Sequence, residues 1–243
     1  MKKRALAFLM SVCMALSLGA AALASEGDAA SDNETPVLGP AAPVEPVADS
    51  AAPETPDAFA APAANPFSDV NSDSPFLPGI LYAVANAITT GTTATTFSPY
   101  MTCTHAQILT FLWRACGAPS VLIENPFPDM PKEAYYYQAA LWAYDKGLIG
   151  PEFQPYAPCT RLQAVTYLWK LAGSPASYDA HKDAFPFADL PDNPDALNAV
   201  AWASMDQSVT NGTTATTFSP DKKCTRAQIV TFLYRGRDAL PTA

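Results

Sequence analysis

Positively charged residues are scarce in this chain. Its 243 residues include 14 lysines and arginines against 23 aspartates and glutamates, which gives a formal net charge of −9 at pH 7. A surplus of acids repels phosphate backbones and anionic lipid surfaces. The composition therefore excludes nucleic acid and membrane surfaces as general partners, and an anion must bind where the few cations gather.

Long apolar runs are absent except near the N-terminus. Cations at positions 2–4 precede an apolar segment at 5–18, and Ala22-Leu23-Ala24 has the small-x-small pattern of a cleavage site. This order is typical of an export signal, and the apolar segment is too short to span a membrane. We predict a signal peptide over residues 1–24 and a secreted protein that has no membrane span after cleavage.

Cysteine and histidine are too few and too scattered to form a known metal or catalytic motif. The chain has no Cys-x-x-Cys spacing, and His181 is not arranged with a nucleophile and an acid. Zinc sites and catalytic triads require such groupings. We therefore predict no enzymatic activity, no cofactor and no metal. Three thiols would meet at a zinc ion only if a threefold arrangement brought them together.

Residues 25–64 differ in composition from the rest of the chain. They are rich in proline, alanine and acids, contain no lysine or arginine, and include few large apolar residues. Such a segment cannot bury enough apolar surface to offset the entropy lost on ordering. We predict a disordered, extended acidic linker, followed by roughly 175 residues, which are enough for one domain with a core.

One short motif occurs three times in the remaining chain. The copies are Cys103-Thr104-His105-Ala106-Gln107, Cys159-Thr160-Arg161-Leu162-Gln163 and Cys224-Thr225-Arg226-Ala227-Gln228. Each copy follows a Phe-x-Pro motif and, further upstream, a Phe-x-Asp motif that begins at Phe67, Phe127 or Phe187. A unit that recurs at this length indicates a repeat architecture. We place the repeats at 65–120, 121–178 and 179–243.

Each repeat is predicted to form a helix, a loop and a second helix. The first helices are expected at 79–87, 136–146 and 196–207, with Gly147 in the left-handed conformation that ends the middle one. The second helices follow the repeated threonine, where apolar residues recur at helical spacing. Because one unit cannot bury its apolar face alone, we predict a mainly α fold in which three repeats pack as a pseudo-threefold bundle. The repeated cysteines, Cys103, Cys159 and Cys224, are interpreted as small buried apolar residues.

The threonine and glutamine of the repeated motif have the spacing of a capping box. In this arrangement the threonine hydroxyl accepts from the N–H three residues later, and the glutamine side chain accepts from the threonine N–H. The predicted pairs are Thr104 with Gln107, Thr160 with Gln163 and Thr225 with Gln228. These residues are fully explained by the start of a helix, so we assign them no further function.

Arg161 and Arg226 need a different explanation. They occupy the first helical position, where the helix dipole disfavours a cation. An anion bound there would meet both the guanidinium and the free N–H groups of the helix start. The alternative is an ion pair with Asp129, Asp189 or an acid of a neighbouring repeat. His105 stands at this position in the first repeat, and because an imidazole carries little charge near pH 7, we expect this site to bind an anion most weakly.

Two further sets of repeated residues have both a structural and a functional interpretation. Trp142 and Trp202 either pack in the core or offer a flat face to a sugar ring. Asp69, Asp129 and Asp189 would serve as an acid and a base only in different environments, whereas repeats give each the same one. We predict that these aspartates cap the start of the next element.

The order of these motifs resembles the S-layer homology domain. The likeness is strongest at Thr225-Arg226-Ala227-Gln228, which is close to the family's Thr-Arg-Ala-Glu box, and it covers about residues 65–238. It implies three repeats around a central helical bundle, at the surface of a Gram-positive cell. It also implies non-covalent binding to a secondary cell-wall polysaccharide with pyruvylated, anionic sugars. The ligand-binding residues that it implies are Arg161, Arg226, His105, Gly91, Gly150, Gly212, Asp69, Asp129, Asp189, Trp142 and Trp202.

The chain departs from the family pattern at three points. Glutamine replaces glutamate in every box, which preserves the cap. His105 replaces arginine in the first box, and the loop of the second repeat is shortened, so both changes weaken the expected contacts with a ligand. The alternative function is a surface protein-interaction or S-layer-like assembly module that does not bind polymer. We predict no cargo domain after the third repeat.

Overall fold

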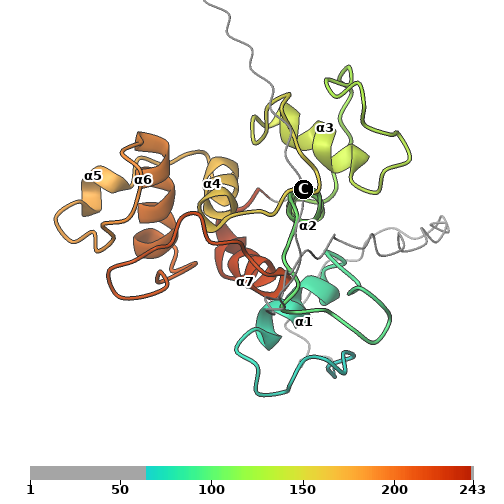
Figure 1. Cartoon of the computed structure of the whole chain (residues 1–243), viewed down its shortest axis with the longest axis horizontal. Helices are drawn as coiled ribbons and strands as arrows, with labels where there is room; N and C mark the ends of the chain where they lie inside the picture. The colour runs from blue at the N-terminus through green and yellow to red at the C-terminus, as the bar shows by residue number, and fades with distance from the viewer. Residues whose placement is uncertain (1–63, 242–243) are drawn as a thin grey trace, which may run out of the picture. The chain divides into compact units, whose positions relative to one another are not determined.

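The computed structural model describes residues 64–241, and this part of the chain is mainly helical (Figure 1). Extended segments within it pair only through three isolated bridges, so the predicted mainly α fold class is confirmed. None of the helices in this range has the length and apolar character needed to cross a membrane. The predicted signal peptide and residues 25–63 of the predicted linker lie outside the described residues.

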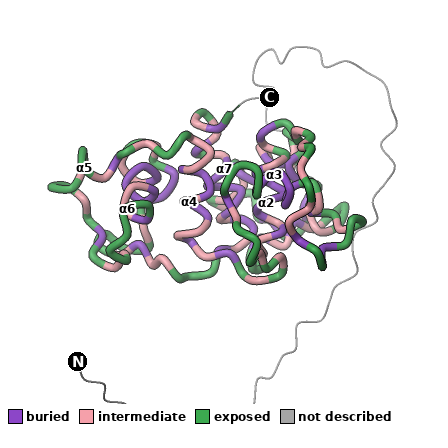
Figure 2. Tube along the Cα trace, turned by 90° about the horizontal axis from the view of Figure 1, so that it is seen from above, coloured by how far each residue is buried: buried purple, intermediate pink, exposed green. Residues whose placement is uncertain are grey.

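The helices follow the order that the sequence predicts, with one addition. The elements are α1 (Leu77–Ala85), α2 (His105–Ala115), α3 (Tyr137–Asp145), α4 (Arg161–Leu171), α5 (Tyr178–His181), α6 (Pro194–Ala201), the π-helical turn η1 (Trp202–Asp206), α7 (Arg226–Gly236) and the 3-10 turn η2 (Arg237–Ala239). The short helix α5 was not predicted, and it contains no buried residue. Figure 2 shows buried residues gathered along the longer helices and exposed ones along the loops and α5.

Helices α2, α4 and α7, the second helices of the three predicted repeats, each begin at a capping box, as predicted. Thr104, Thr160 and Thr225 each accept from the backbone N–H three residues later, at 3.3–3.4 Å. In return, the glutamine side chains accept from the threonine N–H groups at 2.9–3.1 Å. These bonds satisfy two donors that a helix start would otherwise leave unpaired.

The first helix of each predicted repeat packs on the second helix of a different predicted repeat. Helix α3 lies on α2, α6 lies on α4, and α1 lies on α7 (Figure 1). The last of these contacts joins the beginning of the folded region to its end. It is close, because a Cβ added to Gly79 of α1 would lie 2.9 Å from the Cα of Thr231 in α7.

The three repeated cysteines are linked in a closed ring of backbone hydrogen bonds. The N–H of Cys103 donates to the carbonyl of Cys224, that of Cys224 to Cys159, and that of Cys159 to Cys103, each at 2.9 Å. Their side chains are fully buried, and they are free thiols, as is Cys116. The interpretation as small buried residues is confirmed. Within residues 64–241 no cluster of cysteine, histidine and acidic side chains has the arrangement of a metal site.

A π-helical turn accounts for a difference between the second and third repeats. Trp142 stands five positions before Gly147, which has the predicted left-handed conformation with φ +64°. Trp202 stands six positions before Ser208, which is also left-handed with φ +52°. The turn η1 absorbs the additional residue, because a π-helix takes up more residues per turn than an α-helix. Both indoles consequently reach buried positions in the same core.

Candidate functional site: the grooves between repeats

Arg161 and Arg226 cross from the start of one repeat's helix to the loop of another repeat. Nε of Arg161 donates to the carbonyl of Phe218, and Nε of Arg226 to that of Phe97, both at 3.0 Å. Each Cζ lies 4.9 Å from the centroid of the same phenylalanine ring. The arginines are 3% exposed. Each guanidinium therefore holds the Phe-x-Pro loop of its neighbour in place.

The predicted ion pairs of these arginines are not formed. The ion pairs found in residues 64–241 involve other side chains, and neither Arg161 nor Arg226 takes part in them. Their partners are instead carbonyl oxygens and aromatic faces, which are weaker substitutes for water around a full positive charge. Burial accordingly lowers the pKa of both guanidiniums.

The helix starts that carry these arginines have no free N–H groups for an anion, so this part of the prediction is wrong. The N–H of Arg226 donates to Met101 at 2.9 Å, and that of Ala227 to Pro99 at 3.1 Å. At α4, Arg161 and Leu162 donate to Lys222 and Pro220 in the same manner. Carbonyl groups of the neighbouring loop, together with the capping threonine, thus satisfy the donors that usually attract an anion.

The two arginines differ at one atom. Nη2 of Arg161 donates to the hydroxyl of Thr210 at 3.0 Å. Nη2 of Arg226 is buried and has no hydrogen-bond partner in the described part of the chain. Thr89, which occupies the place of Thr210 in the first repeat, is buried but makes no bond to it. The contact of Arg226 with the first repeat's loop therefore keeps one unpaired donor on a positively charged group.

Two of the three repeated aspartates organise the loops on which the arginines rest. Asp69 accepts from the N–H groups of Phe97 and Ser98 at 2.8 and 2.7 Å. Asp189 accepts from those of Phe218 and Ser219 at the same distances. The prediction that they cap the next element is wrong, because their partners lie 28 to 30 residues later. Asp129 is exposed and makes no such bond within residues 64–241.

The loop glycines are also structural in two of the three repeats. Gly91 has φ +97° and Gly212 has φ +80°, and an added Cβ would lie 2.7 Å and 2.5 Å from the rings of Phe67 and Phe187. Only glycine fits such a backbone in so little space. Gly150 has open space around it and no left-handed requirement. It borders a pocket instead.

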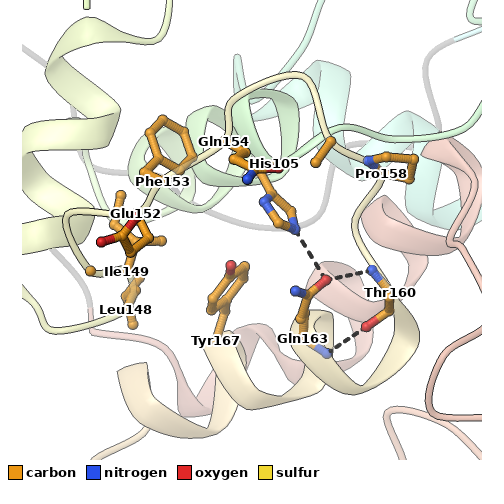
Figure 3. Close-up of a pocket in the computed structure, with 12 residues that line it drawn as sticks. His105, Leu148, Ile149, Glu152, Phe153, Gln154, Pro158, Thr160, Gln163 and Tyr167 are labelled. Carbon is orange, nitrogen blue, oxygen red and sulfur yellow. Dashed lines mark hydrogen bonds between the residues drawn. The ribbon is translucent and has the colours of Figure 1, made fainter. Parts of the chain in front are cut away.

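A pocket opens at His105, whereas the side chains of Arg161 and Arg226 are buried. Nε2 of His105 lies 3.0 Å from Oε1 of Gln163, and the imidazole packs edge-on against the ring of Tyr167 (Figure 3). Because the same oxygen accepts from the N–H of Thr160, Nε2 must be the donor. A pocket of about 560 Å³ lies between His105, the loop at 148–158 and α4. A shorter side chain and a shorter loop leave this volume empty.

The predicted site residues therefore divide among three grooves and the core. Arg226 lies with the loop of Asp69 and Gly91, Arg161 with that of Asp189 and Gly212, and His105 with Gly150. Asp129 stands apart on the surface. Trp142 and Trp202 are buried and offer no face to a sugar, which corrects the proposed stacking role.

Several residues of these grooves were missed. They are Phe97, Phe218, Thr210 and Tyr167. One usable signal was an aromatic residue six positions after His105, Arg161 and Arg226, namely Phe111, Tyr167 and Phe232. Each of these rings contacts the cation or imidazole of a different repeat. Arg226 lies over Phe111 at 5.4 Å, Arg161 lies over Phe232 at 5.5 Å, and His105 packs against Tyr167.

Comparison with known proteins identifies one domain family. The family model described as the S-layer homology domain matches residues 66–109 and 186–230. The first match contains Gly91, Phe97 and His105, and the second contains Asp189 and Arg226. The Arg226–Phe97 groove is thus formed by one residue from each matched segment.

Three relatives share parts of the chain. An endoglucanase of Bacillus sp. (strain KSM-635) is 31% identical over 67% of this chain and 18% of its own length. A cellulosome-anchoring protein of Acetivibrio thermocellus is 30% identical over 48% of this chain and 26% of its own length. Cell surface glycoprotein 1 of the same organism is 36% identical over 37% of this chain and 4% of its own length. The chain thus spans about a quarter or less of the curated relatives it matches.

Proposed function

We propose that this protein attaches non-covalently to the bacterial cell wall by binding an anionic, pyruvylated secondary polysaccharide in the grooves between its repeats. It acts at the cell surface as a binding module rather than as an enzyme. The observation that supports this most directly is the groove of Arg226. There a buried guanidinium forms no direct ion pair within residues 64–241 and keeps one unpaired donor, between the two segments that match the S-layer homology model.

A carboxylate bound directly to Nη2 would complete the hydrogen bonding of Arg226. A buried positive charge with an unpaired donor is costly, and a bound anion lowers that cost. The planar guanidinium forms strong hydrogen bonds with carboxylates, worth about 1.5–3 kcal/mol each. A pyruvate ketal places such a carboxylate on a sugar ring. A bound carboxylate would stabilise Arg161 less, because its Nη2 already donates to the hydroxyl of Thr210.

The middle segment is proposed to be a third repeat of the same kind. Residues 121–178 lie outside the two family matches. They nevertheless supply Cys159 to the central ring of hydrogen bonds and a capping box at Thr160. Arg161 contacts the third repeat as Arg226 contacts the first. These equivalent positions support a protein with three grooves, one at each junction between repeats.

The relatives support a location at the cell surface. Two of them are named as a cellulosome-anchoring protein and a cell surface glycoprotein. We extend the surface location to this chain. The match to the endoglucanase covers 18% of that protein, so we propose no cellulase activity on its account.

Sedimentation with isolated cell walls tests the proposal. Protein beginning at residue 25 is mixed with walls before and after chemical extraction of the secondary polymer, and the bound fraction is measured. We expect binding to intact walls and its loss from extracted walls. Binding that is equally strong after extraction would overturn the proposal.

A surface assembly module is the second candidate. The observation that favours it is a set of exposed large apolar side chains, which includes Tyr100, Leu122 and Tyr156. Exposed apolar side chains mark contacts between proteins where they form one contiguous patch. Concentration-dependent self-association in light scattering, without binding to walls, would favour this function over polymer binding.

A further inference from the structure

We propose that the pocket at His105 binds an uncharged sugar unit, in contrast to the anionic unit assigned to the groove of Arg226. This inference rests on the proposed function only in taking the ligand to be a wall glycan. The protein would then recognise two chemically different units of one polymer. The pocket of about 560 Å³ lies within the range of small-molecule sites, about 300–1,000 Å³.

Tyr167 supplies a hydroxyl to the lining of the pocket. The residue as a whole is 7% exposed, and the hydroxyl makes no hydrogen bond in the described part of the chain. Figure 3 shows the hydroxyl pointing from α4 into the pocket, below His105. A hydroxyl at the wall of a pocket is free to bond to a ligand that enters it.

The Tyr167 hydroxyl keeps its proton and can therefore donate. Burial raises the pKa of Tyr167. A phenol that donates and accepts is suited to a sugar hydroxyl, which does both. Gln154 on the pocket wall adds an amide with the same versatility.

The charges around the pocket exclude an anionic unit as its preferred ligand. No lysine or arginine lines it, and Glu152 contributes a negative charge. A pyruvylated sugar would meet that carboxylate without a cation to compensate. An uncharged ring avoids this repulsion and can place its apolar face against Phe153 or Tyr167.

The walls of the pocket are held in position before any ligand arrives. Phe153 packs against Phe127 and Tyr136, with ring centroids 5.6 and 6.2 Å apart. The side chain of Gln163 is fixed by its bonds to Thr160 and His105. A preorganised site loses less entropy on binding, which favours even a small ligand such as one sugar.

Saturation-transfer NMR tests the inference with defined probes. The uncharged probes are the methyl glycosides of glucose, galactose and N-acetylglucosamine, and the anionic probe is the 4,6-pyruvate ketal of methyl galactoside. We expect at least one uncharged glycoside to receive saturation from the wild-type protein. Tyr167→Phe should reduce that signal at least fivefold. Tyr100→Phe, which removes the same hydroxyl from a tyrosine that is 75% exposed, should leave it unchanged.

A second variant tests the inference if Tyr167→Phe does not fold. His105→Arg introduces a longer side chain at the pocket and should also abolish the signal, while the thermal unfolding midpoint of each variant reports on folding. The inference is overturned if no uncharged glycoside binds, or if binding survives both substitutions in folded protein. Failure of wall sedimentation with intact binding of the uncharged probe would instead overturn the proposed wall anchoring alone.

Discussion

The guanidinium of Arg226 rests on the ring of Phe97, a residue 129 positions earlier in the chain. One side chain thus joins the third repeat to the first by a hydrogen bond to the backbone and by contact with an aromatic face. The same contact leaves Nη2 without a partner. The contact with Phe97 and the proposed ligand binding therefore involve different atoms of this arginine.

The stability of two methionine variants should separate these roles. Arg226→Met removes a buried charge with an unpaired donor, and such a replacement is often neutral or stabilising. Arg161→Met leaves the buried hydroxyl of Thr210 without its partner. We expect Arg161→Met to lower the free energy of unfolding by about 1–2 kcal/mol more than Arg226→Met. Urea unfolding measures both, and equal losses would contradict the difference at Nη2.

Wall binding should depend on Arg226 more than on His105. Arg226→Ala removes the charged donor from the proposed anionic site, which should weaken affinity by roughly tenfold or more. His105→Ala removes no permanent charge and should have a smaller effect. A sedimentation titration with isolated walls gives both affinities. The reverse order would refute the assignment of the anionic site to Arg226.

Substitution of the repeated aspartates should affect stability in two repeats and not in the third. Asp69→Asn and Asp189→Asn each disturb a carboxylate that accepts from two backbone N–H groups, and each should cost about 1 kcal/mol. Asp129→Asn is the matched control, because this exposed side chain holds no loop. Thermal unfolding of the three variants provides the comparison, and a loss as large in Asp129→Asn would count against the loop role.

The contact between α1 and α7 should not tolerate a methyl group. Gly79→Ala places a Cβ 2.9 Å from the backbone of Thr231, so a helix must shift, at a cost of about 1–3 kcal/mol. Gly150→Ala, which meets no atom within 4 Å, should change stability by less than about 0.5 kcal/mol. Chemical unfolding of the pair measures the difference. Equal stabilities would show that the two helices are packed less closely.

Stability should fall in mildly alkaline solution because of the buried thiols. Burial raises the pKa of Cys103 to about 12 and those of Cys116 and Cys224 to about 11. Unfolded thiols ionise near pH 8.5, so above that pH the folded state binds more protons and loses stability as the pH rises. Each thiol contributes a slope of about 1.4 kcal/mol per pH unit.

Unfolding free energies measured from pH 7.5 to pH 10 report this slope. Cys116→Ala removes one thiol and should reduce the steepness of the fall, whatever its effect at neutral pH. A stability that stays constant up to pH 10 in the unsubstituted protein would contradict the burial of ionisable thiols.

Local features of this protein were predictable, and contacts between repeats were not. Thr225 and Gln228 are three residues apart on one helix, so their spacing alone determines the capping box. Phe97 and Arg226 meet only because the first repeat closes on the last, and the spacing of residues within a repeat carries no information about that closure. For the same reason, the sequence did not predict that loop carbonyls of another repeat accept from the N–H groups at the helix starts.

The groove at His105 shows a second limit. The replacement of arginine by His105 predicts the weakest anion binding at this site, and this stays a prediction. Charge does not reveal volume, however. The pocket arises from two coincident losses, a shorter side chain and a shorter loop, and its size depends on where Tyr167 and Phe153 pack.

The contact between α1 and α7 also affects how the folded region responds to a pulling force. A load applied at the N-terminal end reaches Asn65, whose side chain is tied to the carbonyl of Val70 at 2.7 Å, and passes from there into α1. Helix α1 lies against α7, near the opposite end of the folded region. Force that enters before α1 therefore acts on the contact of α1 with α7, at the other end of the folded region.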